Sequence, residues 1–244
     1  MHAFTTTTWT ELKLLIREPA AAIFVLGLPL LLLMMNSTHG NDPVPELGGV
    51  GALDTLVPGY LALVIATMGL MVLPVHLAGY REQGVLRRQR ATPLSPTVLL
   101  ASHVVVAMIV TVVGVGVLVA VGMAAFDLNP PTHPVWTLVA LLMSAASIYA
   151  LGFFLAGVVR TARTAQAVAA GLYFPMIFLS GATWPRHVMS DTLRTLGDFL
   201  PLTYAIEAMQ HPWTGRPIPL MAIAFLAVTA IVAAILSART FRWE

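Results

Sequence analysis

The chain has 244 residues, of which 58% are hydrophobic and only 10% are charged, and its formal net charge is +2. A water-soluble domain of this length could not hide so much apolar surface, whereas lipid accommodates it, so the composition indicates an integral membrane protein. The sequence contains no cysteine, which excludes disulfides and thiolate metal sites.

The N-terminal segment, residues 4–18, predicts an amphipathic helix that lies on the membrane surface. Its apolar side chains recur at helical spacing and are Trp9, Leu12, Leu15 and Ile16. Lys13 and Arg17 are assigned to the opposite side of this interfacial helix. The alternative is that the segment is simply the start of the first membrane span.

Six apolar runs follow, and they predict an all-α fold with six transmembrane helices. The runs are Ala20–Asn36, Leu56–Ala78, Val98–Phe126, Val135–Val159, Ala167–Leu179 and Ile218–Ala238. No acidic or basic residue lies near the middle of any run, which gives no support to a proton relay or an ion-coupled transporter. The chain, residues 1–244, is therefore interpreted as a single transmembrane domain.

Residues 185–214, which precede the sixth run, have the least regular pattern. One helical face is predicted from apolar residues at four-three-four spacing, namely Met189, Leu193, Leu196 and Leu200. Pro201 breaks that pattern, and a second piece, Thr203–Gln210, is expected to carry Ile206 and Met209 inward. Both pieces are too short and too polar to cross a bilayer. We expect short re-entrant or interfacial helices on the outer side.

The distribution of charge predicts the orientation. With six spans, both termini and the segment 80–96 share one side with ten of the thirteen Lys and Arg residues but only four of the eleven acids. The positive-inside rule places this side in the cytoplasm. Because the composition favours Arg, Ala and Val, the expected location is a bacterial plasma (inner) membrane, crossed several times, with both termini cytoplasmic.

The segment Tyr80–Pro96 is a basic stretch between two apolar runs and holds four of the thirteen basic residues and one acid. A segment this basic must face water. Its arginines could bind acidic groups of a protein partner, although anionic lipid headgroups would satisfy them equally well.

Few residues could carry chemistry by themselves. His187 and Asp191 are four residues apart and could share a helix face, but a solvated pair is favoured over a metal site. His76, His103 and Asp54 are interpreted as interface residues that reach water. No catalytic residue is assigned to the chain.

The glycines inside the spans predict close helix packing. Gly114 and Gly116 lie within a span and do not complete a dinucleotide-binding fingerprint, and Gly152-x-x-x-Ala156 is a small-residue spacing. A Gly-x-x-x-x-Gly-Lys-Ser/Thr loop is absent from the sequence, so the chain cannot hold ATP by that route.

Several motifs together resemble one known family. They are Arg81–Arg88 with its acid, Gly, Leu and Arg, then Ala91–Ser95 with Thr-Pro-Leu-Ser, Phe178–Gly181 with Pro185, Pro201–Tyr204 with Glu207, and Phe241–Trp243. With the six-span plan, this order resembles type-2 ABC (ATP-binding-cassette) exporter permeases. The ending is similar to that of daunorubicin-resistance-type drug efflux permeases of actinobacteria.

The resemblance implies a partner. In such permeases the segment 80–96 forms a cytoplasmic coupling helix that docks on an ABC ATPase dimer, and ATP and Mg²⁺ are bound there rather than by this chain. The residues that the resemblance assigns to coupling are Arg81, Glu82, Gly84, Leu86, Arg88, Thr92 and Pro93. Helical spacing places Glu82, Leu86 and Gln89 on one face of this helix. The other expected partners are a second permease copy or a paralogue and membrane lipids, with no nucleic acid.

The resemblance also implies a path and a lid. The first, second and fifth spans would line a mostly apolar path between two permease copies, suited to amphipathic or lipid-like compounds. An exit lid would be formed by Gly181, Pro185, Pro201, Tyr204 and Glu207. The alternative for residues 185–214 is an outer cap with no moving part.

Two functions remain open from the sequence. One is the permease subunit of an exporter that moves drug-like or lipid-like compounds out of the cell, driven by ATP hydrolysed on a separate chain. The alternative is a membrane assembly or regulatory subunit that binds cytoplasmic partners through the same segment and transports nothing.

Overall fold

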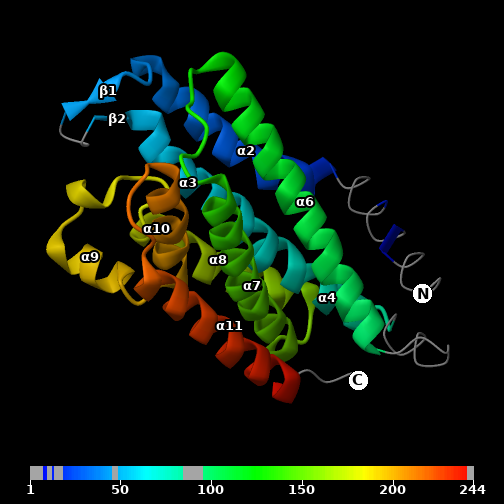
Figure 1. Ribbon diagram of the computed structural model, residues 1–244. Helices are drawn as coiled ribbons and strands as arrows, with labels where there is room; N and C mark the ends of the chain where they lie inside the picture. The colour runs from blue at the N-terminus through cyan, green and yellow to red at the C-terminus, as the bar shows by residue number, and fades with distance from the viewer. Residues whose placement is uncertain (1–7, 10–12, 14–18, 46–48, 85–95, 241–244) are drawn as a thin grey trace.

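A computed structural model describes residues 8–9, 13, 19–45, 49–84 and 96–240 of the chain. Long helices form one bundle, and the short helices and strands gather at the end opposite the C-terminal end of α11, drawn in red (Figure 1). The long helices are α2 (Pro19–Asn36), α3 (Ala52–Ala66), α4 (Leu73–Glu82), α6 (Pro96–Ala125), α7 (Pro134–Val158), α8 (Ala162–Leu179) and α11 (Leu220–Thr240). Helix α4 is short by itself but continues α3 in one span, Ala52–Glu82. The other helices are α9 (Asp191–Gly197) and α10 (Pro201–Trp213), with 3₁₀ turns at Ser37–His39 and Arg186–Val188.

The bundle is mostly helical, as expected, with one small addition. Strands β1 (Pro43–Val44) and β2 (Val50–Gly51) pair antiparallel in the connection between α2 and α3, with Pro43 opposite Gly51. A fold that is predominantly helical and apolar agrees with the all-α membrane class.

Within the described residues, four helices are long and apolar enough to cross a membrane. They are Ala52–Glu82, Ala101–Ala125, Pro134–Val158 and Leu220–Thr240. These correspond to the second, third, fourth and sixth predicted spans. The first and fifth predicted spans are helical as α2 and α8, each of 18 residues, but they do not belong to this set of four.

The span Ala52–Glu82 is the core of the bundle. Of its most apolar 18-residue stretch, 78% is buried inside the protein, whereas the corresponding share is 28% for Ala101–Ala125 and 17% for Leu220–Thr240. Helix α7 packs against α11, α10, α4 and α3. Since Ala52–Glu82 occupies the centre, α6 and α11 lie at the periphery and most of their side chains face away from the bundle.

A short π-helix of six residues, Thr67–Val72, joins α3 to α4 inside this buried span, and we call it the π-turn. Helix α7 crosses this segment closely: a Cβ added at Gly152 of α7 would overlap the carbonyl oxygen of Gly69. A Cβ added at Gly69 would in turn come within 2.7 Å of Ile148 Cγ2. The close packing predicted for Gly152 is confirmed, because only a residue without a side chain lets the two backbones touch.

The other predicted packing glycines behave differently from each other. A Cβ on Gly114 would lie 3.3 Å from Leu26 Cδ2 and 3.3 Å from Val64 Cγ1, so α6 approaches α2 and α3 closely there. Gly116 has nothing within 4 Å of such an atom among the described residues. The packing prediction is thus confirmed for Gly114 and wrong for Gly116.

The predicted interfacial helix, residues 4–18, lies mostly outside the described residues. Where it is described, the ammonium group of Lys13 lies 5.8 Å from the ring centre of Trp9. The assignment of these two residues to opposite sides is therefore wrong, because residues four apart share one face of a helix.

Candidate functional site

The predicted coupling residues divide between the described and undescribed parts of the chain. Arg81, Glu82 and Gly84 close α4, whereas the remaining four, namely Leu86, Arg88, Thr92 and Pro93, lie outside the described residues. The rest of the segment 80–96 is described only at Tyr80, Gln83 and Pro96. The face shared by Glu82, Leu86 and Gln89 accordingly stays a prediction.

Arg81 and Glu82 bind the connection between α7 and α8. The Arg81 guanidinium donates a hydrogen bond to the Val159 carbonyl oxygen at 2.8 Å, and the Glu82 carboxylate accepts one from the Ala162 N–H at 3.0 Å. Val159 is the residue that caps the C-terminus of α7, and Ala162 is the first residue of α8. We call this pair of contacts the Arg81–Glu82 clamp.

The clamp satisfies backbone groups that helices leave unpaired. The first N–H groups and last carbonyls of a helix have no partner within it, and a carboxylate at an N-terminus also interacts favourably with the helix dipole. Within α8 itself, the Thr161 hydroxyl accepts from the Thr164 N–H at 3.2 Å. The N-terminus of α8 is therefore capped twice, once from its own chain neighbour and once from the end of α4.

Gly84 ends α4 in the way that a glycine allows. Its φ is +68°, in the left-handed region, and its N–H donates to the Arg81 carbonyl oxygen at 3.0 Å. No described residue lies within 4 Å of a Cβ added there, and the positive φ alone favours glycine at this position. This helix end lies within the predicted coupling segment, residues 80–96.

At the opposite end of the bundle, Asp54 joins three separate segments. It lies in the first turn of α3 and is only 5% exposed. Its carboxylate accepts from Asn41 Nδ2 at 3.0 Å, from the Asn129 N–H at 3.0 Å and from Asn129 Nδ2 at 2.8 Å. Asn41 Oδ1 in turn accepts from the Leu53 N–H at 3.0 Å. The expectation that Asp54 reaches water is wrong, because the two asparagines replace its water shell.

His103 corrects the sequence interpretation in a similar way. It is only 9% exposed, and its ring centre lies 5.4 Å from that of Tyr80. His76 and His103 line a small cavity of about 40 Å³ between the second and third spans. His103 thus does not reach water as expected but packs inside the bundle.

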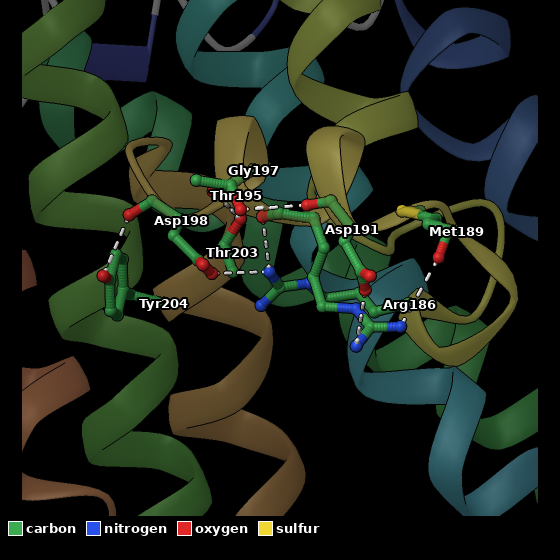
Figure 2. A network of polar contacts seen from close by, with 9 residues as sticks. Arg186, Met189, Asp191, Thr195, Gly197, Asp198, Thr203 and Tyr204 are labelled. Atoms are coloured by element: carbon green, nitrogen blue, oxygen red, sulfur yellow. Dashed lines mark hydrogen bonds and ion pairs between the residues drawn. The ribbon is translucent and has the colours of Figure 1, made fainter.

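Gly181 and Pro185 form the turn that follows α8. Gly181 has φ +92°, and a Cβ there would come within 2.6 Å of Arg186 Cγ. The Arg186 guanidinium donates to Asp198 Oδ1 at 2.5 Å and to the Arg194 carbonyl oxygen at 2.9 Å, which fastens the turn to α9 (Figure 2). The break predicted after the fifth run is therefore a turn that is hydrogen-bonded to α9 and to the residue after it.

The residues of α10 complete this end. Pro201 is the first residue of α10, and the Thr203 hydroxyl donates to the Gly197 carbonyl oxygen at 2.6 Å. The Tyr204 hydroxyl donates to the Asp198 carbonyl oxygen at 2.9 Å (Figure 2), and its ring stacks on Phe225 at 4.0 Å. Ile206 and Met209 are buried, as predicted.

A cleft of about 470 Å³ lies between the start of α3, the turn after α8 and α10. It is lined by Ala52, Thr55, Leu56, Gly59, Ser180, Gly181, Pro185, Arg186, Thr203, Ile206, Glu207, Gln210 and Arg216. Of the five predicted lid residues, Gly181, Pro185 and Glu207 meet at this cleft. Pro201 and Tyr204 hold α10 in place without lining it.

The sequence did not single out several residues of these sites. Asn41, Asn129 and Arg216 were missed, since their roles depend on contacts between distant segments. The one available signal was Asp54 itself, an acid at the start of an apolar run with no basic residue near it in the sequence.

Asp191 has a protein partner at this end. Its carboxylate lies 3.8 Å from Arg194 Nη1, and its side chain is 99% exposed. Over the part of the chain that the structure describes, no three His, Cys, Asp or Glu side chains gather as metal ligands would.

The architecture and both sites can now be compared with known proteins. A family model described as "ABC-2 type transporter" matches residues 2–212. Among curated proteins, the chain is similar to "ABC transporter G family member 20" of Dictyostelium discoideum, with 24% identity over 160 residues. This alignment covers 65% of the chain but only 22% of the relative, so the chain spans roughly a fifth of that protein's length. With its apolar, membrane-spanning helices, the chain is a multi-pass membrane protein that belongs to the ABC-2 type transporter family.

Proposed function

We propose that the chain is the permease subunit of an ATP-driven ABC exporter that moves amphipathic or hydrophobic compounds out of the cell. In this proposal a separate ATPase subunit docks on the segment 80–96 and supplies the hydrolysis of ATP. Membership of the ABC-2 family supports the transport role, and the absence of a phosphate-binding loop from the sequence supports a separate ATPase.

The Arg81–Glu82 clamp is the observation that carries the proposal. It lies where α4 leads into the predicted coupling segment, and it binds the first residue of α8. Helix α8 then continues without a break to Leu179, next to the turn that lines the cleft. A displacement of the segment 80–96 by an ATPase would therefore be passed through the clamp to α8 and along it to the opposite end of the bundle.

In the same proposal α2 and α8 cross the membrane as the first and fifth of six spans. Eighteen residues of α-helix extend about 27 Å, close to the roughly 30 Å of a bilayer core. Both helices carry exposed apolar side chains, such as Met34 on α2 and Phe178 on α8, which a second permease copy or lipid would cover. The excess of Arg on the side of Glu82 supports a bacterial inner membrane with cytoplasmic termini.

A reconstitution experiment tests the proposal. The chain is purified with the ATPase that binds it, placed in proteoliposomes, and assayed for ATP-dependent movement of a fluorescent phospholipid analogue. We expect Glu82→Lys to lower the amount moved per ATP hydrolysed by roughly five- to tenfold, because the reversed charge cannot accept from Ala162 N–H. Leu86→Ala is expected to act in the same direction by weakening ATPase docking.

Arg163→Glu is the matched control. Arg163 is exposed on the first turn of α8, close in sequence to the clamp, and forms no ion pair or hydrogen bond with another described residue. We expect this reversal to leave coupling unchanged. Unchanged coupling in both Glu82→Lys and Leu86→Ala would contradict the proposal. If an ATPase binds the chain but the complex moves no tested compound, the alternative of a non-transporting assembly subunit is favoured instead.

A further inference from the structure

The cleft between α3, the turn after α8 and α10 has an apolar wall beside charged groups. Leu56 and Ile206 supply apolar surface, whereas Arg186, Glu207 and Arg216 bring charge. Its volume of about 470 Å³ falls within the roughly 300–1,000 Å³ that small-molecule sites occupy. A mixed lining of this kind suits a ligand with one polar end and one apolar end.

Most polar groups of the cleft already have partners within the protein. The Gln210 amide donates to the Thr55 carbonyl oxygen at 2.9 Å, and the Thr203 hydroxyl donates to the Gly197 carbonyl oxygen at 2.6 Å. The charge of Arg186 is neutralised by Asp198 at 2.5 Å. Each of these three side chains thus has at least one partner within the protein.

Glu207 and Arg216 are different. Each lines the cleft, yet among the described residues neither side chain forms a hydrogen bond or an ion pair, including with each other. Glu207 is half-buried on α10, next to the apolar surface of Ile206. A carboxylate that has lost part of its water shell gains from a cationic partner.

Arg216 is held in position by its backbone. Gly215 adopts φ +75°, and the Arg216 N–H donates to the His211 carbonyl oxygen at 2.8 Å, while the His211 ring contacts the Pro217 carbonyl oxygen at 2.8 Å. The loop after α10 is thus tied back onto α10. Its guanidinium remains available to an anionic group at the cleft.

We propose that this cleft binds the headgroup of a zwitterionic amphiphile. Glu207 would bind an ammonium group, Arg216 a phosphate or carboxylate, and the apolar wall of Leu56 and Ile206 the start of the alkyl chain. The inference deepens the proposed exporter function by naming a substrate class, and it rests on that function only for the direction of transport. Binding itself requires no ATPase.

Three single-chain amphiphiles of equal chain length test the charge requirement. They are lysophosphatidylethanolamine, which is zwitterionic, lysophosphatidylglycerol, which is anionic, and an alkyltrimethylammonium salt, which is cationic. Binding to the purified full-length chain in a neutral maltoside detergent is measured by native mass spectrometry. We expect the zwitterion to bind roughly three- to tenfold more tightly than either of the others.

The charge-neutralising variants give opposite expectations and so control for each other. Glu207→Gln should lose the preference over the anionic amphiphile but keep the preference over the cationic one. Arg216→Gln should do the reverse, and a variant that keeps one preference is still folded at the cleft. Asp191→Asn, on the exposed surface of α9, should change neither preference.

Two outcomes would overturn the inference: equal binding of all three amphiphiles to the unchanged protein, or identical preferences in both variants. These results are separable from a failure of the proposed function. Headgroup-selective binding with no ATP-driven movement would contradict the exporter alone. ATP-driven movement with headgroup-independent binding would contradict the cleft alone.

Discussion

Asp54 shows how a single ionisable residue can be removed from water without an opposite charge. Its carboxylate is surrounded by three N–H donors from Asn41 and Asn129, which lie 13 and 75 residues away in the sequence. Hydrogen bonds to an ionised acceptor are among the stronger ones in proteins. The residue therefore acts as a joint between the α2–α3 connection, α3 and the α6–α7 connection.

Replacing this joint should destabilise the protein. We expect Asp54→Ala to lower the free energy of unfolding by about 2–3 kcal/mol, because the three hydrogen bonds that Asn41 and Asn129 donate to this charged acceptor are lost. The measurement is chemical or thermal unfolding of the purified protein in detergent. Asp42 is exposed and directly precedes β1, and Asp42→Ala should change the free energy of unfolding by less than about 0.5 kcal/mol. Equal effects of the two substitutions would contradict this role of Asp54.

The sequence alone could not reveal this joint. An acid at the edge of an apolar run is ordinarily an interface residue, and that interpretation fails here only because two loops fold back over α3. The resemblance to exporter permeases assigns Gly181, Pro185 and Glu207 to one site, with Gly181 and Pro185 at a visible break in an apolar run, and all three line the cleft. Arg216 was not predicted, since its place at the cleft depends on the loop that follows α10.

At the scale of helices, the crossing of α7 over the π-turn is set by two glycines. Gly152→Val would place side-chain atoms where the Gly69 carbonyl oxygen lies, and the helices would have to separate. We expect a loss of about 1–3 kcal/mol of stability, read from the unfolding transition, together with reduced transport. Gly116→Val, in α6 with open space around it, is the control and should be tolerated. Similar losses in both variants would exclude a special role for the crossing.

The presence of the long helices could be predicted from the sequence, but the local irregularity within one of them could not. Long apolar runs bounded by polar turns predict helices whatever their partners, so α2, α3, α6, α7, α8 and α11 were expected. The π-turn was not, because Thr67–Val72 is as apolar as the residues on either side. This segment packs against α7 and α8, which local composition does not reveal.

At the scale of the whole molecule, the number of membrane crossings decides which connections between helices lie on the same side of the membrane. If α8 crosses the membrane, Arg163 in its first turn and Ser190 beyond its C-terminus lie on opposite sides. Single-cysteine variants at these two exposed positions can be labelled cleanly, because the chain has no cysteine of its own. We expect a membrane-impermeant maleimide added outside the cell to label Ser190→Cys but not Arg163→Cys. Labelling of both from the same side would show that α8 does not cross.

The π-turn has a consequence for the clamp at the far end of the same helix. A π-turn holds an additional residue compared with an α-helical turn, and each residue of an α-helix advances its side chains by about 100° around the axis. Everything after Val72 is therefore rotated relative to an uninterrupted helix. Without this change of phase, Arg81 and Glu82 would be turned by about 100° around the helix axis from the direction in which they contact Val159 and Ala162. The π-turn in the middle of the bundle thus sets the direction in which Arg81 and Glu82 project from the end of α4.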